Sequence, residues 1–184
     1  MIVNPAHAFG PGDPGRSSHD AGAPVHAPSD PAYVEGTLNV VGVQDVARGH
    51  LLADERGTVG ERYHFQQSEF HHGPLFADLG RLSRVEPPAL KLPLPVALAA
   101  GGQRVGGIAV PTPVEARTAS LNWAFVNRKA KRELGWKTSP HEDCLEETVA
   151  WYRGRDGVRV SRPGARQPVP LRLVGGALRR VGRL

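Results

Sequence analysis

Residues 38–53 read LNVVGVQDVARGHLLA and predict one strand–helix unit. The β-branched run Leu38–Val43 is typical of a short strand. Asp45 follows where a helix N-cap belongs, because a carboxylate there accepts hydrogen bonds from the free amides of the next turn. Gly57 fits the C-cap of the same helix. The apolar helical face between these caps comprises Val46, Ala47, His50, Leu51 and Ala53. A strand that leads directly into a helix indicates the α/β class.

The flanking sequence adds short elements and long loops. Met1–Asn4 predicts the end of a buried strand, and the Gly/Pro/His/Ser-rich Pro5–Pro31 predicts one long loop. Residues 101–120 show no periodicity of either kind. The other expected elements are a strand at Glu61–Phe65, a helix from Pro74, an extended segment at Leu90–Leu92, a helix start at Val96–Ala100, a helix at Arg128–Leu134 capped by Asn127, and a last helix at about His141–Arg153. We therefore expect an α/β fold with a few short strands, three or four helices and long irregular loops.

The positive charge of the chain is concentrated at its C-terminus. The 184 residues carry a net charge of +5, yet residues 153–184 hold nine arginines against one aspartate. Three prolines and the pair Gly175–Gly176 predict that no regular helix forms there. We expect a folded part at 1–153 and a basic, disordered tail at 154–184. Such a tail suits nucleic acid or anionic lipid, although it has no aromatic residue to stack on a base.

Few residues carry recognisable chemistry. Cys144 is the single cysteine, which excludes a disulfide framework within the chain, and its amphipathic setting predicts a buried structural thiol. The eight histidines show no HExxH or HxxxH spacing, so we expect no metal site. No glycine-rich phosphate loop follows a strand, and none of the three tyrosines is followed four residues later by lysine. We therefore expect no catalytic residue in this chain.

The sequence also bears on location. It has no run of 18 apolar residues that would predict a membrane span, and its start does not fit a secretory signal. We therefore expect a cytoplasmic protein.

Four motifs, in order along the chain, resemble the C-terminal, substrate-binding part of extended short-chain dehydrogenase/reductases. They are NPAHAFGPGD (Asn4–Asp13), LNVVGVQDVARGHLLA (Leu38–Ala53), GERYHF (Gly60–Phe65) and VNRKAKRELGWKTSPHEDCLEETVAWYR (Val126–Arg153). Within those enzymes the sequence is similar to the NAD-dependent epimerase/dehydratase family, in its dihydroflavonol-reductase-like and hopanoid-associated sugar epimerase branch. The resemblance implies the C-terminal part of a Rossmann-type fold.

The resemblance also implies a reaction and a set of site residues. Enzymes of this family transfer hydride between NAD or NADP and a sugar-nucleotide or another carbonyl or hydroxyl substrate, which would make a small molecule the partner of this chain. By position in the motifs, the cofactor-side residues would be Pro5, Ala6 and His7, and the substrate-side residues Asp13, Tyr33 and Arg62. Turn chemistry explains Pro5 equally well. The helix cap remains the favoured role for Asp45.

The chain also departs from the family pattern. The nucleotide-binding half, with its glycine-rich loop and its Tyr and Lys, has no counterpart here, and Gly15–Asp30 shows no helical pattern. We expect either a truncated copy that is inactive alone, with a separate chain supplying the nucleotide-binding half, or a start at an internal methionine. The alternative is a non-catalytic remnant or interaction module whose Arg-rich tail binds anionic partners.

Overall fold

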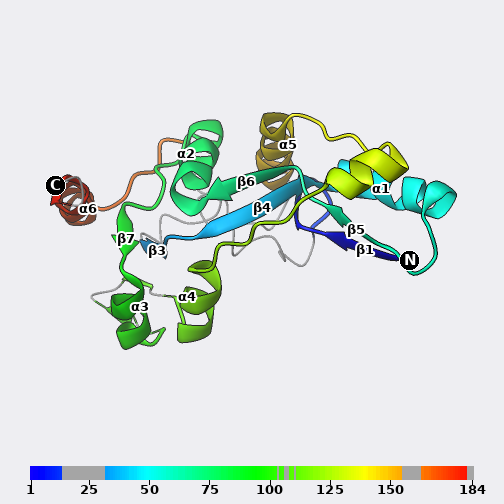
Figure 1. Ribbon diagram of the computed structural model, residues 1–184. Helices are drawn as coiled ribbons and strands as arrows, with labels where there is room; N and C mark the ends of the chain where they lie inside the picture. The colour runs from blue at the N-terminus through cyan, green and yellow to red at the C-terminus, as the bar shows by residue number, and fades with distance from the viewer. Residues whose placement is uncertain (14–31, 103, 106–107, 110, 155–162, 182–184) are drawn as a thin grey trace. The chain divides into compact units, whose positions relative to one another are not determined.

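The structure is a computed structural model that describes residues 1–13, 32–102, 104–105, 108–109, 111–154 and 163–181 (Figure 1). The chain divides into two compact units. Unit 1 comprises Met1–Ser18, Leu38–Phe70 and Trp123–Asp156, and unit 2 comprises His19–Thr37, His71–Asn122 and Gly157–Leu184. The α/β class expected from the sequence is confirmed, because short strands and helices alternate along the described chain.

Unit 1 is built on two small sheets. In one, β1 (Ile2–Pro5) pairs in parallel with β5 (Arg62–Phe65), with Asn4 opposite His64. In the other, β4 (Thr37–Gly42) lies between β2 (His7–Phe9) and β6 (Ser68–His71). Strand β2 falls inside the segment expected to be one long loop, so that expectation was wrong for His7–Phe9. Residues 14–31 of the same segment lie outside the described residues.

Helix α1 (Val43–Arg56) follows β4 without a break, as the sequence of residues 38–53 predicts. Its start differs from the expected one: Gly42 is the N-cap, and no side chain caps the helix. The cap role of Asp45 was wrong, because this residue lies inside the first turn and its carboxylate accepts hydrogen bonds from the Ser139 amide at 2.8 Å and hydroxyl at 3.0 Å. The side chain therefore joins α1 to a distant segment of unit 1.

The core of unit 1 forms where α1, β4 and β5 meet the C-terminal segments. Phe65 packs against Trp136 with ring centroids 4.9 Å apart, among buried Val41, Ala53, Tyr63, Ala130 and Leu134. The helix expected near Arg128 is present, and its last part is the π-helix η2 (Ala130–Leu134). Asn127 stands just before this helix, where its carbonyl accepts from the Lys131 amide at 3.0 Å and its side-chain amide donates to the Gln66 carbonyl.

Helix α5 (His141–Arg153) confirms the last expected helix. Its apolar face is buried as predicted, with Leu145, Thr148, Val149 and Tyr152 inside. Acidic Glu142 and Asp143 stand in its first turn, where the positive end of the helix dipole favours negative charge.

Unit 2 combines a parallel strand pair with short helices. Its elements are β3 (Ala32–Val34), α2 (His72–Ser83), β7 (Leu90–Leu92), α3 (Leu94–Ala100), β8 (Arg104–Val105), β9 (Ile108–Ala109), α4 (Pro113–Ala119) and α6 (Val169–Val181). Strand β3 pairs with β7, and α3 lies beside α4 (Figure 1). Helix α4 was not expected from the sequence. Thr112 and Glu115 form a capping box at its start, in which the Thr112 amide donates to Glu115 Oε2 at 2.7 Å.

Helix α6 corrects the expectation that prolines and glycines prevent a helix near the C-terminus. Pro170 stands in the first turn, where a missing N–H costs no intrahelical hydrogen bond. Gly175 is buried against the Ala89 carbonyl, and a Cβ added there would lie 2.3 Å from that oxygen. The glycine therefore permits close contact between α6 and Ala89 within unit 2, and it does not end the helix. The domain boundary at residue 153 stays a prediction.

Candidate functional site at the open edge of strand β1

Strand β1 has an edge that no described strand covers. Among the described residues, β1 pairs only with β5. The Ile2 amide donates to Glu61 and the Ala6 amide to Phe65, both at 2.8 Å. Backbone hydrogen-bonding groups alternate in direction along a strand. The N–H and carbonyl of Val3 and the carbonyl of Pro5 therefore point to the opposite edge. This explains why β1 is half exposed, with Ile2 at 47%, and not buried as the sequence suggested.

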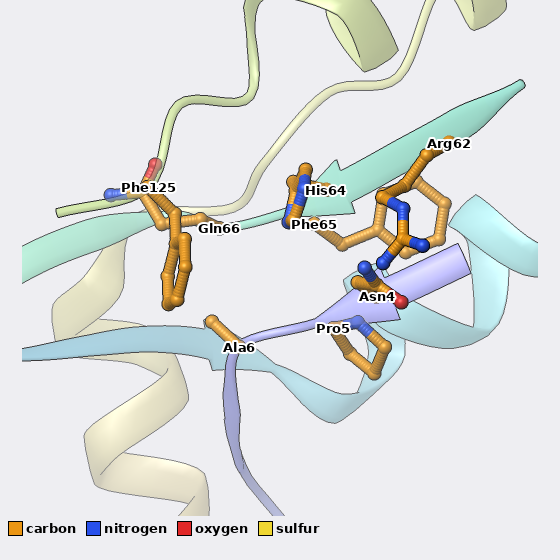
Figure 2. A pocket seen from close by; sticks show the side chains of 8 residues that line it. All are labelled: Asn4, Pro5, Ala6, Arg62, His64, Phe65, Gln66 and Phe125. Atoms are coloured by element: carbon orange, nitrogen blue, oxygen red, sulfur yellow. The ribbon is translucent and has the colours of Figure 1, made fainter. Parts of the chain in front are cut away.

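A cavity of about 280 Å³ opens at the carboxyl ends of β1 and β5. Figure 2 shows the side chains that surround it: Asn4, Pro5, Ala6, Arg62, His64, Phe65, Gln66 and Phe125. The carboxyl ends of parallel strands are the usual position of ligands in α/β sheets. The volume lies at the lower limit for a small-molecule site, which suits one ring of a ligand better than a whole dinucleotide.

The walls of this cavity combine an aromatic pair with polar groups. The rings of His64 and Phe125 are stacked, with centroids 5.6 Å apart and planes 9° from parallel. When the Asn4 amide is oriented to satisfy both of its atoms, its oxygen accepts from Arg62 Nη1 at 2.9 Å. No carboxylate is found among the described residues that line the cavity. The site therefore suits a planar ring that carries an amide or an anionic group.

Three of the six site residues expected from the sequence meet here. Pro5, Ala6 and Arg62 all line the cavity. His7 lies outside it on β2, opposite Val40, with its ring 6.0 Å from that of Phe9.

The other two expected residues are not among those that line the cavity. The Asp13 carboxylate accepts a hydrogen bond from the Tyr152 hydroxyl at 3.1 Å. Tyr33 belongs to unit 2, where its ring meets Phe76 edge-on at 5.3 Å. Their substrate-side roles stay a prediction.

Sequence reasoning missed five lining residues: Asn4, His64, Phe65, Gln66 and Phe125. The signal for His64 was available, since alternation along β5 places it on the same strand face as Arg62. Phe125 belongs to an irregular segment, Trp123–Val126, for which no periodicity exists to give an orientation.

The single cysteine of the chain has the environment of a structural thiol. Cys144 is buried as expected, with Sγ 3.6 Å from the Phe9 carbonyl. Burial, reinforced by the charges of Asp45 and Glu147, raises the pKa of this thiol to about 12. Within the described part of the chain, no three metal-binding side chains gather. Nor is any helix there long and apolar enough to cross a membrane.

The comparisons with known proteins agree with this architecture. A dihydroflavonol 4-reductase-like protein of Synechocystis is 30% identical over 140 residues, 71% of this chain and 41% of that protein. The structure of gox2253 is 37% identical with a TM-score of 0.65, covering 83% of this chain and 48% of its own. The chain resembles members of the NAD-dependent epimerase/dehydratase family over the C-terminal part of their length. It spans less than half the length of these relatives. No family model matches the chain.

Other solved structures place the family within the extended short-chain reductases. A nucleoside-diphosphate-sugar epimerase from Pseudomonas aeruginosa is 26% identical with a TM-score of 0.68, covering 83% of this chain and 47% of its own. Structures that contain NADPH or NAD align at 15–22% identity with TM-scores of 0.50–0.53, which shows the shared fold alone.

Proposed function

We propose that this chain forms the substrate-side part of an NAD(P)-dependent reductase or epimerase, and that the β1–β5 cavity receives the nicotinamide end of the cofactor. The substrate would be a sugar-nucleotide or another small carbonyl or hydroxyl compound. The observation that carries the proposal is the meeting of Pro5, Ala6 and Arg62 around one cavity at the carboxyl ends of two parallel strands.

The lining residues fit that end of the cofactor. A nicotinamide ring is planar and bears a carboxamide, and the His64–Phe125 pair offers a flat aromatic wall. The amide of Asn4 offers both a donor and an acceptor. Arg62, which the resemblance placed on the substrate side, would in this proposal hold the neighbouring phosphate of the cofactor by charge-assisted hydrogen bonds.

When bound, the cofactor supplies or accepts the hydride. The part of this chain is to orient the ring and to exclude water on one side of it. The acid–base step needs groups from outside the chain, because no tyrosine here is followed four residues later by lysine. The open edge of β1 supports a separate nucleotide-binding part that supplies the acid–base groups, since this edge leaves room for a further parallel strand. The proposed location of such an enzyme is the cytoplasm.

The test measures which end of the cofactor contacts the chain. Saturation-transfer NMR is recorded with NADPH and with nicotinamide mononucleotide, for the wild type, Arg62→Gln and the control Arg132→Gln, an exposed arginine paired with Glu133. We expect stronger saturation of nicotinamide than of adenine protons, and about tenfold weaker binding for Arg62→Gln only, the loss of about 1.4 kcal/mol. Equal saturation of both rings, or equal effects of the two variants, would overturn the proposal.

A further inference from the structure

Helix α6 exposes an apolar face. The fractional exposures of Val169, Leu173 and Val174 are 62%, 69% and 51%. Val169 and Leu173 are four residues apart and so lie on the same side of the helix, with Val174 next to them around the axis. The helix sequence, VPLRLVGGALRRV, contains no acidic residue.

The other side of α6 contacts the rest of unit 2. The Glu86 carboxylate accepts hydrogen bonds from the backbone amide of Gln167 and from Arg172 Nε, both at 2.8 Å. One turn further on, Gly175 lies against the Ala89 carbonyl. Because these contacts fix the rotation of the helix, its exposed aliphatic side chains point away from unit 2 in a defined direction.

The segment that contains this face is positively charged in sequence. From residue 157 to the C-terminus the chain contains seven arginines and no acidic residue. Arg166 is exposed just before the helix, and Arg179 and Arg180 belong to its sequence. Glu86 pairs with Arg172 alone among the described arginines of this segment. The helix therefore combines an exposed aliphatic side with cationic residues, which is the composition of helices that lie in a membrane interface.

We propose that α6 binds the surface of an anionic lipid bilayer, lying in the plane of the headgroups with Leu173 and Val174 entering the acyl boundary. Nucleic acid would satisfy the arginines but would leave these aliphatic side chains in water. The segment also lacks an aromatic residue for stacking on bases. The proposal is independent of the cofactor site, which belongs to unit 1.

The first experiment is vesicle flotation of the full chain. Vesicles of equal parts phosphatidylglycerol and phosphatidylcholine are compared with vesicles of phosphatidylcholine alone, at low and high salt. We expect binding to the anionic vesicles that weakens at least tenfold at high salt, and little binding to neutral ones. Absence of binding to anionic vesicles at low salt would overturn the proposal.

Variants separate the apolar contribution from the charge. The double variant Leu173→Ser/Val174→Ser is compared with Val59→Ser, a valine that is 92% exposed outside the helix. We expect vesicle binding to weaken at least tenfold in the double variant and to stay unchanged in the control. Binding to duplex DNA should be the same for both variants. Equal vesicle binding by the wild type and the double variant would identify a purely electrostatic tail and contradict the proposal.

A labelled protein tests insertion without relying on a destabilised variant. Because Cys144 is buried with a pKa of about 12, it reacts slowly near neutral pH, and Val174→Cys takes an environment-sensitive fluorophore selectively. We expect a blue shift on adding anionic vesicles, and none for the label at Val59→Cys. An unchanged spectrum at position 174 would show that the helix does not enter the bilayer.

Discussion

The carboxylate of Asp45 accepts hydrogen bonds from both the backbone amide and the hydroxyl of Ser139, 94 residues further along the chain. Asp45 also accepts from Arg48, and its backbone carbonyl accepts from Trp136 Nε1 at 2.8 Å. With a side chain that is 1% exposed, Asp45 is a buried carboxylate whose partners come from its own helix and from the segment before α5. It therefore holds the C-terminal part of unit 1 against α1.

Removal of this carboxylate should destabilise the protein strongly. In Asp45→Ala the amide and hydroxyl of the partly buried Ser139 lose their acceptor, so we expect a loss of about 1–3 kcal/mol in the free energy of unfolding. The control Asp54→Ala changes an exposed residue of the same helix and should cost less than about 0.5 kcal/mol. Urea titrations followed by circular dichroism measure both, and equal losses would contradict this role.

Two glycines inside helices should respond in opposite ways to alanine. A Cβ at Gly49 would lie 2.7 Å from the Phe65 ring, whereas nothing lies within 4 Å of one at Gly176. Overpacking costs about 1–3 kcal/mol and outweighs a gain of about 1 kcal/mol in helix propensity, so Gly49→Ala should be destabilised. Gly176→Ala should instead be stabilised by about 0.5–1 kcal/mol. Thermal unfolding measures both, and a stabilised Gly49→Ala would refute the packing of α1 on β5.

The buried thiol predicts a dependence of stability on alkaline pH. Burial, with Asp45 and Glu147, raises the pKa of Cys144 to about 12, whereas a thiol in the unfolded chain has a pKa of about 8.5. Between these values the folded state keeps a proton that the unfolded state has lost. The thiol's contribution is therefore complete below about pH 8.5 and declines as the pH rises. Compared with Cys144→Ala, the wild type should lose up to about 1.4 kcal/mol more per pH unit above pH 9. If the urea midpoints of the wild type and Cys144→Ala changed in parallel with pH, the predicted contribution of the thiol would be wrong.

Glu35 in unit 2 predicts the opposite behaviour in acid. Burial acts to raise the pKa of its carboxyl, but Lys91, 3.2 Å away, and backbone donors outweigh it and lower the pKa. The stabilisation is therefore present above the unfolded value of about 4.3 and is lost as the pH falls through the lower folded value. Glu35→Gln should flatten the acid limb of the stability profile, while Glu69→Gln, at an exposed position of β6, should not. An unchanged acid limb in Glu35→Gln would exclude this pairing.

The predictability of the fold depended on whether a local signal existed. The strand–helix unit around α1 and the buried face of α5 follow from short-range periodicity, and both are confirmed. Asp45 was misassigned because a carboxylate at a helix start satisfies local capping rules equally well, and its distant partner Ser139 is not visible in sequence. The capping box of Thr112 and Glu115 was a readable signal for α4 that periodicity alone missed.

The candidate site was predictable in the same partial way. The motif resemblance pointed to Pro5, Ala6 and Arg62, which the fold brings together through the parallel pairing of β1 with β5. The contribution of Phe125 depends on an irregular segment placed by tertiary contacts, among them the bond from the Asn39 amide to the Trp123 carbonyl. No pattern in the sequence carries that information.

We propose above that the β1–β5 cavity receives the nicotinamide end of NAD(P). It is tested most directly by recording amide NMR spectra of the isotope-labelled chain during titration with nicotinamide mononucleotide. We predict saturable shifts of the Ala6, Arg62 and His64 signals, with Tyr33 unchanged, and loss of these shifts in Arg62→Gln. Shifts confined to unit 2, or no shifts at these three residues at millimolar ligand, would contradict the account.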